Sequence, residues 1–294
     1  MKQTILGAIY LSLAASIWGG MYVVSKYVLD FIPPLTLVWL RFIIAFVVLY
    51  GILKIAEKKQ KKKVTIRKKD WLLFAWIGFI GYFISITCQF IGTKLSDAHT
   101  GSLVTSATPA FMVIFAALIL KEKLTARRLL STIIATIGVI IVIGWDIEIG
   151  YYFIGTIILV GAAITWALLS IYVKTASARF SSLVITTYAI FFSLFFITPF
   201  MIWELQTSSI GTVNTYVILG VLYLGIVSTA GAFFLWNKGL DLMDASIGSL
   251  FFFFQPIVGS LLGWLLLNET LNSNFFIGGI LIICSVFITT FEKK

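Results

Sequence analysis

The chain has 294 residues, of which 60% are hydrophobic and 12% are charged. Soluble domains carry about 25% charged residues, so this composition excludes an ordinary soluble protein and indicates an integral membrane protein. The formal net charge is +10. The basic residues gather in short segments between apolar runs, a pattern that predicts contact with membrane lipid and no binding of nucleic acid.

Apolar runs that are long enough to cross a bilayer as helices, which takes roughly 20 residues each, occur about ten times. They are residues 4–25, 35–53, 71–93, 98–120, 128–145, 152–173, 183–203, 215–236, 245–267 and 274–291. We therefore predict an all-α integral membrane protein with ten transmembrane helices.

Residues 97–124 recur as residues 244–271 at a constant offset of 147, with identical residues at ten positions. The matches include Asp, Gly-Ser, Pro and Glu at the same spacings, which chance does not readily produce in an apolar sequence, so they indicate an internal duplication. Pro109 and its match Pro256 lie near the centre of the two predicted helices. Interrupted helices at matching positions of two halves are typical of transporter binding sites.

The duplication predicts two five-helix repeats, residues 1–145 and 146–294. Because five is an odd number, the second repeat has the opposite orientation in the membrane, as in many secondary transporters. With the N-terminus in the cytoplasm, all but three of the 22 Lys and Arg residues fall on or near the cytoplasmic side; the exceptions are Lys26, Arg41 and Lys94. This positive-inside pattern predicts a multi-pass protein of the plasma (inner) membrane with cytoplasmic N- and C-termini.

Two residues stand out inside predicted helices. Trp18 lies deep in its helix, where an indole N–H needs either a hydrogen-bond partner or a cavity. Arg41 falls roughly 9–10 Å into the second helix at 1.5 Å per residue. It either meets an acidic group on a substrate or in a gate, or extends to the outer interface with its charge in water.

Glu122 and Glu269 end the two duplicated blocks at helix C-termini, where the helix dipole disfavours an anion. The structural interpretation is local pairing, for Glu122 with Lys121 or Lys123, and the functional interpretation is a role in a gate. Cys88 and Cys284 lie apart in different halves and form no metal-binding pattern. We expect no disulfide, metal or cofactor.

These features together resemble the EamA-type members of the drug/metabolite transporter superfamily. The resemblance rests on the two five-helix halves, Trp18 and Trp166, Arg41 in the segment WLRF, and the paired blocks that end at Glu122 and Glu269. It implies a central cavity surrounded by predicted helices 1, 3, 4, 6, 8 and 9, with helices 5 and 10 at the periphery. The substrate-binding residues that it implies are Trp18, Tyr22, Tyr82, Gln89, Thr105, Ser106, Pro109, Trp166, Ser170, Ser228, Trp236, Gln255 and Pro256. Arg41, Glu122 and Glu269 are the candidate gating or charge-pairing residues.

The resulting hypothesis is a secondary transporter that moves a small organic metabolite, an amino acid or a related compound, by alternating access in the direction of export. No Asp or Glu falls in the middle third of a predicted helix, where proton-coupled carriers place a titratable acid, so we expect facilitated transport. A multidrug or nucleoside permease of the same fold is the first alternative. Two further alternatives lie outside transport. A lipid-modifying enzyme would need clustered acids or an activated nucleophile. A membrane binding protein without transport would use the same helices. The substrate, the transport direction, the coupling ion and the oligomeric state, for which a monomer is one candidate, stay open.

Overall fold

The computed structural model describes residues 2–60, 65–96, 98–143, 151–267 and 273–290. Across these residues the regular secondary structure is helical, and no strand is present. The elements are α1 (Lys2–Leu29), α2 (Pro34–Gln60), α3 (Lys68–Ile77), η1 (Gly78–Ser85), α4 (Ile86–Leu95), α5 (Ala98–Thr105), α6 (Thr108–Ile119), α7 (Ala126–Ile143), α8 (Tyr151–Ser177), α9 (Ser182–Thr207), α10 (Thr215–Leu222), η2 (Tyr223–Gly231), α11 (Ala232–Asp241), α12 (Ala245–Ser249), η3 (Leu250–Phe253), α13 (Phe254–Leu267) and α14 (Ser273–Thr290).

Six helical segments in the described part of the chain are long and apolar enough to cross a membrane. They are Gln3–Leu29, Pro34–Lys59, Lys68–Leu95, Phe153–Ser177, Ser182–Thr207 and Thr215–Asp241. Shorter apolar helices span Thr108–Ile119 and Ala245–Gly259. Six such segments make this a multi-pass membrane protein, because each supplies the length of apolar helix that a hydrocarbon core needs.

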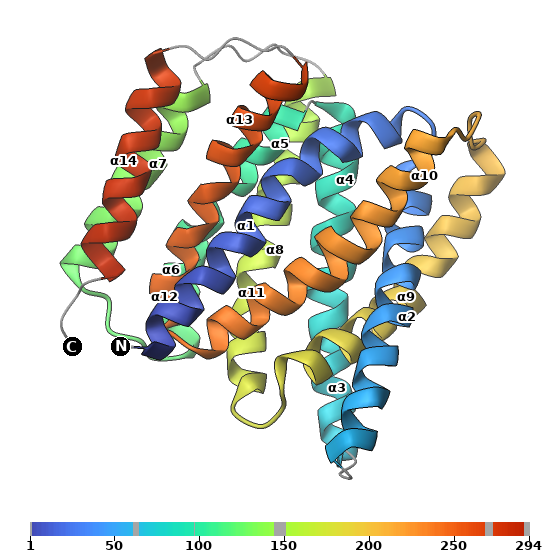
Figure 1. The fold of residues 1–294 in the computed structure, drawn as a ribbon, viewed down its shortest axis with the longest axis horizontal. Coiled ribbons are helices and arrows are strands. Elements are labelled where there is room, and N and C mark those ends of the chain that lie inside the picture. Colours follow the sequence, from blue (N-terminus) through green and yellow to red (C-terminus); the bar gives the residue numbers. More distant parts are fainter. Residues whose placement is uncertain (1, 61–64, 97, 144–150, 268–272, 291–294) are drawn as a thin grey trace.

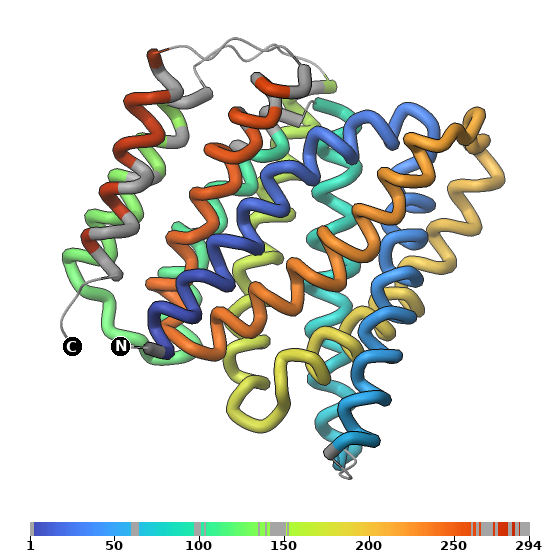
Figure 2. The backbone as a smooth tube through the Cα atoms, in the orientation of Figure 1, coloured from blue at the N-terminus to red at the C-terminus, as the bar shows by residue number. Residues whose placement is uncertain are grey.

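The helices form one bundle with α1 near its centre (Figure 1). α1 packs against α11 and α13, α4 packs against α8, and α2 packs against α9 at one edge. α7 and α14 pack against each other at the opposite edge, which is the peripheral position expected for the fifth and tenth predicted helices. The backbone trace in Figure 2 runs in opposite directions along α1 and α8, and along α2 and α9.

Both predicted proline interruptions are present. α5 ends at Thr105 and α6 begins at Thr108, with Pro109 in the first turn of α6. Hydroxyl groups bond the carbonyl groups near this break: Ser106 Oγ donates to Ser102 O at 2.7 Å and Thr108 Oγ1 donates to Thr105 O at 2.6 Å. In the second copy the chain passes through the short 3₁₀ helix η3 before Pro256. Such breaks are tolerated at membrane depth where neighbouring groups satisfy the freed backbone.

The structure adds a feature that the sequence pattern did not predict. η1 and η2 are π-helical segments inside otherwise α-helical rods, and they occupy matching positions of the two halves. A π-helical turn is rare and leaves backbone groups with altered pairing. In η2 the Thr229 hydroxyl donates to Leu224 O, and Ser228 O accepts the indole N–H of Trp18 at 3.0 Å.

Candidate functional site

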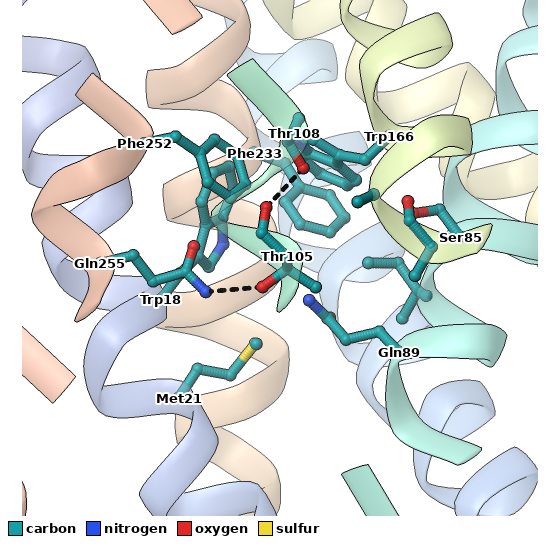
Figure 3. A pocket seen from close by; sticks show the side chains of 13 residues that line it. Trp18, Met21, Ser85, Gln89, Thr105, Thr108, Trp166, Phe233, Phe252 and Gln255 are labelled. Carbon is teal, nitrogen blue, oxygen red and sulfur yellow. Dashed lines mark hydrogen bonds between the residues drawn. The ribbon is translucent and has the colours of Figure 1, made fainter. Parts of the chain in front are cut away.

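A cavity with about 340 Å³ of unoccupied space, its opening included, lies among the central helices. Its lining comes from α1, η1, α4, α5, α6, α8, α11, η3 and α13, which belong to predicted helices 1, 3, 4, 6, 8 and 9. These are the helices that the resemblance implied. The lining residues are Trp18, Met21, Ser85, Ile86, Gln89, Thr105, Thr108, Ala162, Ala163, Trp166, Phe233, Phe252 and Gln255 (Figure 3).

Aromatic rings make up one wall of the cavity. The ring centroids of Trp18 and Trp166 are 5.2 Å apart and the two planes are nearly perpendicular. Trp18 also contacts Phe252 at 5.6 Å, and Trp166 contacts Phe233 at 5.2 Å. Rings from α1, α8, α11 and η3 thus form one cluster, in which the edge-to-face contact of Trp18 and Trp166 adds to the gain from burial.

Polar groups face this aromatic wall. Gln89 Nε2 donates to the Tyr22 hydroxyl at 2.6 Å, and that hydroxyl lies 2.7 Å from Thr105 Oγ1. Gln255 Nε2 donates to Thr105 Oγ1 at 3.3 Å. Figure 3 shows Gln255 and Gln89 on opposite sides of Thr105. The network therefore ties α1, α4, α5 and α13 together at one level of the bundle.

Three polar atoms of the lining are buried without a hydrogen-bond partner among the described residues. They are Trp166 Nε1, Gln89 Oε1 and Gln255 Oε1. An unpaired buried donor or acceptor costs about 1–3 kcal/mol, so a ligand that pairs with these atoms gains binding energy. The site offers one fixed N–H donor and two carbonyl acceptors between aromatic faces, and the side chains lining it carry no formal charge. Such a lining suits a small amphipathic organic molecule.

Five of the thirteen predicted binding residues line the cavity itself: Trp18, Gln89, Thr105, Trp166 and Gln255. Tyr22 joins them through its hydrogen bonds. Tyr82, Ser170, Ser228 and Trp236 lie one layer behind: the Trp236 indole donates to Ser170 Oγ at 3.2 Å, and Tyr82 accepts from Asn237 Nδ2 at 2.9 Å. Ser106, Pro109 and Pro256 belong to the helix breaks and not to the lining.

Arg41 is completely buried, so the interpretation that it extends to the outer interface is wrong. Its Nε donates to Thr229 Oγ1 at 2.7 Å and its Nη2 to Ser228 Oγ at 3.2 Å, both on η2. Its Nη1 points at Met21 Sδ, 3.6 Å away. Because η2 crosses α2 closely, with Gly225 against Ile44, the guanidinium reaches the back of the cavity wall.

Glu122 does not pair with Lys121 or Lys123. Its carboxylate accepts from the backbone N–H groups of Ala245 and Ser246, at 2.9 and 3.2 Å, and from the Ser246 hydroxyl. Arg128 lies 3.5 Å from Glu122 and 2.8 Å from Asp244. The end of the first duplicated block is therefore joined to the start of the second by hydrogen bonds and ion pairs. Glu269 lies outside the described residues.

Eight lining residues were not predicted: Met21, Ser85, Ile86, Thr108, Ala162, Ala163, Phe233 and Phe252. Most of them lie within one helical turn of a predicted residue, such as Ser85 before Gln89 and Ala162 before Trp166. An extension by three or four positions from each predicted residue would have found them, because such positions share a helix face.

The model of the EamA-like transporter family matches the chain twice, at residues 5–144 and 153–291. The chain belongs to the EamA-like transporter family. It is therefore a membrane transporter and not an enzyme, and it acts on a small-molecule substrate within a lipid environment. Among the described residues no group of His, Cys, Asp and Glu side chains is arranged to hold a metal ion.

Several curated relatives match almost the whole chain. A Bacillus subtilis protein named "Uncharacterized transporter YetK" is 29% identical over 97% of this chain and 87% of its own length. An Escherichia coli protein named "Probable amino-acid metabolite efflux pump" is 25% identical over 96% of this chain and 94% of its own. A solved crystal structure with 20% identity aligns with a TM-score of 0.78 over 97% of this chain and 96% of that chain, and it shares the fold.

Proposed function

We propose that this protein is a secondary transporter that moves an amino acid or a related small metabolite across the plasma membrane by alternating access, in the direction of export. The observation that carries the proposal is the central cavity, which receives aromatic and unpaired polar groups from matching helices of both halves. The printed names of the Escherichia coli relative and of a Salmonella typhimurium relative, both amino-acid metabolite efflux pumps, favour this substrate class and direction.

Many carriers that work by alternating access consist of two similar halves of opposite orientation, and we propose ten transmembrane helices in two inverted repeats, 1–145 and 146–294. Close backbone contacts support this division. Gly7 and Gly239 face each other across α1 and α11, while their sequence counterparts Gly155 and Gly92 face each other across α8 and α4. Gly7 lies in the second turn of α1 and Gly155 in the second turn of α8, and these two helices run in opposite directions through the bundle (Figure 2), as expected for inverted copies.

The cluster of Glu122, Arg128, Asp244 and Ser246 is the proposed cytoplasmic gate, which we call the inner latch. It joins the end of α6 and the start of α7 to the first turn of α12, so it connects the two halves. A carboxylate at a helix N-terminus binds backbone N–H groups with the favourable sign of the helix dipole. The positive-inside pattern puts this end of the molecule in the cytoplasm, with both termini.

We further propose facilitated transport without a coupling ion. The lining of the cavity has no carboxylate or imidazole to bind and release a proton. The second candidate is a multidrug or nucleoside permease of the same fold. The aromatic wall favours it too, because the flat rings of nucleosides and drugs stack on Trp and Phe side chains.

The test is counterflow in liposomes that contain the purified protein, preloaded in separate batches with amino acids, nucleosides and cationic dyes. Saturable uptake of a labelled amino acid, driven by the same unlabelled compound inside and without a pH gradient, is the expected result. Exchange of nucleosides or dyes alone would favour the second candidate. A requirement for a proton gradient would contradict facilitated transport, and the absence of counterflow for every compound would contradict the transport proposal.

A further inference from the structure

We propose that Arg41 binds the carboxylate of the transported molecule and so determines that the substrate is an organic acid or an amino acid. The inference rests on the proposed transport function and assigns one residue in it. Arg41 sits behind the cavity wall, between α2 and η2, where its guanidinium contacts two lining side chains, Met21 and Phe233.

The first support is the missing counter-charge. Arg41 is fully buried, and no carboxylate lies within ion-pair distance of it among the described residues. Its oxygen partners are the two neutral hydroxyl groups of Ser228 and Thr229. A buried cation is costly to keep without an anionic partner, and ionisable residues inside a membrane commonly belong to the substrate or ion pathway.

The second support is unused hydrogen-bonding capacity. A guanidinium has five N–H groups in a planar fork. Here Nε and Nη2 bond hydroxyl oxygens, while the hydrogen-bond partner of Nη1 is the sulfur of Met21, which is a weak acceptor. The guanidinium also lies over the rings of Phe90 and Phe233, 4.9 and 5.9 Å from their centroids, and these neutral rings leave its charge without an anionic partner. Nη1 is therefore the nitrogen with the weakest hydrogen-bond partner, and that partner, Met21, lines the cavity. A carboxylate is the group that matches such a fork, because it accepts two parallel N–H bonds.

The third support is the nature of the Met21 side chain. Met21 both lines the cavity and contacts Arg41. A methionine has three rotatable side-chain bonds and fits many shapes, so it can change rotamer with little loss of packing. We infer that the thioether moves aside when substrate binds and that the carboxylate takes its place beside Nη1.

The rest of the cavity suits the remainder of such a molecule. The unpaired Oε1 atoms of Gln89 and Gln255 accept hydrogen bonds, which an ammonium group supplies. The rings of Trp18 and Phe252 line the cavity, and aromatic rings interact favourably with an apolar side chain or a cation. The arrangement therefore fits a zwitterion with its carboxylate at Arg41 and its ammonium at the two amides.

The alternative is a structural role, in which Arg41 only holds the π-helical segment η2 against α2. Loss of that role would reduce stability and weaken binding of all ligands alike. Carboxylate recognition instead predicts a change in the ratio of two affinities. The deciding readout is the preference for an acid over its matched neutral analogue.

The experiment measures tryptophan fluorescence quenching of the purified full chain in lipid nanodiscs, with two matched pairs as probes: L-leucine with L-leucinol, and L-phenylalanine with L-phenylalaninol. Each alcohol keeps the ammonium group and the side chain but lacks the carboxylate. For at least one pair, we expect the acid to bind about tenfold more tightly than the alcohol. Arg41→Gln should bring this ratio close to one, and Arg41→Lys should keep part of it because the charge remains.

Arg179→Gln is the matched control, because Arg179 pairs with Asp70, neither residue lines the cavity, and the substitution should leave the ratio unchanged. Met21→Ala covers the case in which Arg41→Gln fails to fold. It opens the wall in front of Arg41 and should raise the ratio above that of the native chain, whereas a structural role for Arg41 predicts no change.

Equal affinity for acids and alcohols in the native chain, or an undiminished ratio in folded Arg41→Gln, would overturn the assignment. If none of the four compounds binds while counterflow detects a nucleoside or a dye, transport stands and carboxylate recognition is wrong. If counterflow detects no compound at all, both proposals fail.

Discussion

Trp18 and Trp166 occupy matching positions of the duplicated sequence but have different hydrogen-bond partners. The Trp18 indole donates to Ser228 O at 3.0 Å, whereas Trp166 Nε1 has no partner among the described residues. Both rings line the cavity and contact each other. One tryptophan therefore has a bond that holds α1 to η2, and the other lines the cavity with a buried, unpaired donor.

This difference predicts that the same substitution, Trp to Phe, affects ligand binding at one position and stability at the other. Trp166→Phe removes an unused donor, so it should weaken ligand binding by about three- to tenfold with little change in stability. Trp18→Phe deprives a buried carbonyl of its partner and should lower the free energy of unfolding by about 1–3 kcal/mol. Thermal unfolding and counterflow KM, measured on both variants, check the prediction. Equal losses of stability in the two variants would contradict it.

The roles of single residues were only partly predictable. Trp18 and Arg41 stood out because an indole and a guanidinium are rare deep in apolar helices. Their partners could not be deduced, since Trp18 bonds a carbonyl 210 positions away and Arg41 bonds hydroxyls 187 and 188 positions away. For Glu122, the structural interpretation of the sequence predicts an ion pair with Lys121 or Lys123. In the structure its carboxylate instead binds the start of α12.

At the scale of elements, two helix crossings depend on glycines facing each other. A Cβ atom at Gly92 would lie 2.6 Å from Leu159 Cγ and 2.9 Å from Gly155 O. A Cβ atom at Gly239 would lie 2.5 Å from Leu11 Cγ and 3.1 Å from Gly7 O. These distances leave no room for a methyl group, and small residues are the usual means by which membrane helices approach closely.

Gly92→Ala and Gly239→Ala should therefore both destabilise the fold, each by about 1–3 kcal/mol, because overpacking forces the helices apart. Gly161→Ala in α8 is the matched control: a Cβ atom there has nothing within 4 Å, and alanine has the higher helix propensity. Thermal unfolding in detergent compares the three variants. A loss at Gly161 as large as that at Gly92 would argue against the packing explanation.

Helix lengths and proline breaks were predictable at this scale, and the π-helical segments were not. Runs of about 20 apolar residues and the two prolines act locally, through the thickness of the bilayer and through a missing backbone donor. The π-helical segments make contacts with other helices, such as the hydrogen bonds from Trp18 and Arg41 to η2. A local sequence pattern therefore does not predict them.

For the whole molecule, the inner latch predicts how the conformational equilibrium responds to one charge. Glu122→Gln keeps the size of the side chain but removes the attraction to Arg128 and replaces one acceptor oxygen with a donor. The variant should therefore favour the inward-open state. Ser170, fully buried beside Trp236, is a suitable reporter between the cavity and the proposed cytoplasmic end.

The measurement is the rate at which a membrane-impermeant thiol reagent modifies Ser170→Cys in inside-out vesicles, with Cys88 and Cys284 replaced by serine. Glu122→Gln should raise this rate several-fold. Glu204→Gln is the control, because Glu204 binds the N–H groups of Leu35 and Thr36 at the opposite end of the bundle. An equal rise with Glu204→Gln, or no rise with Glu122→Gln, would argue against the latch.

The sequence by itself determined the membrane class, the positions of the apolar helices, the duplication and the family, because all of these depend on composition, local hydropathy and spacing. It also indicated five of the cavity-lining residues. Only the tertiary structure decided which polar atoms are paired, that Arg41 lies behind Met21, and that Glu122 joins the two halves. These facts depend on contacts between residues more than 100 positions apart, or across helix faces, whose geometry is set by how the helices cross.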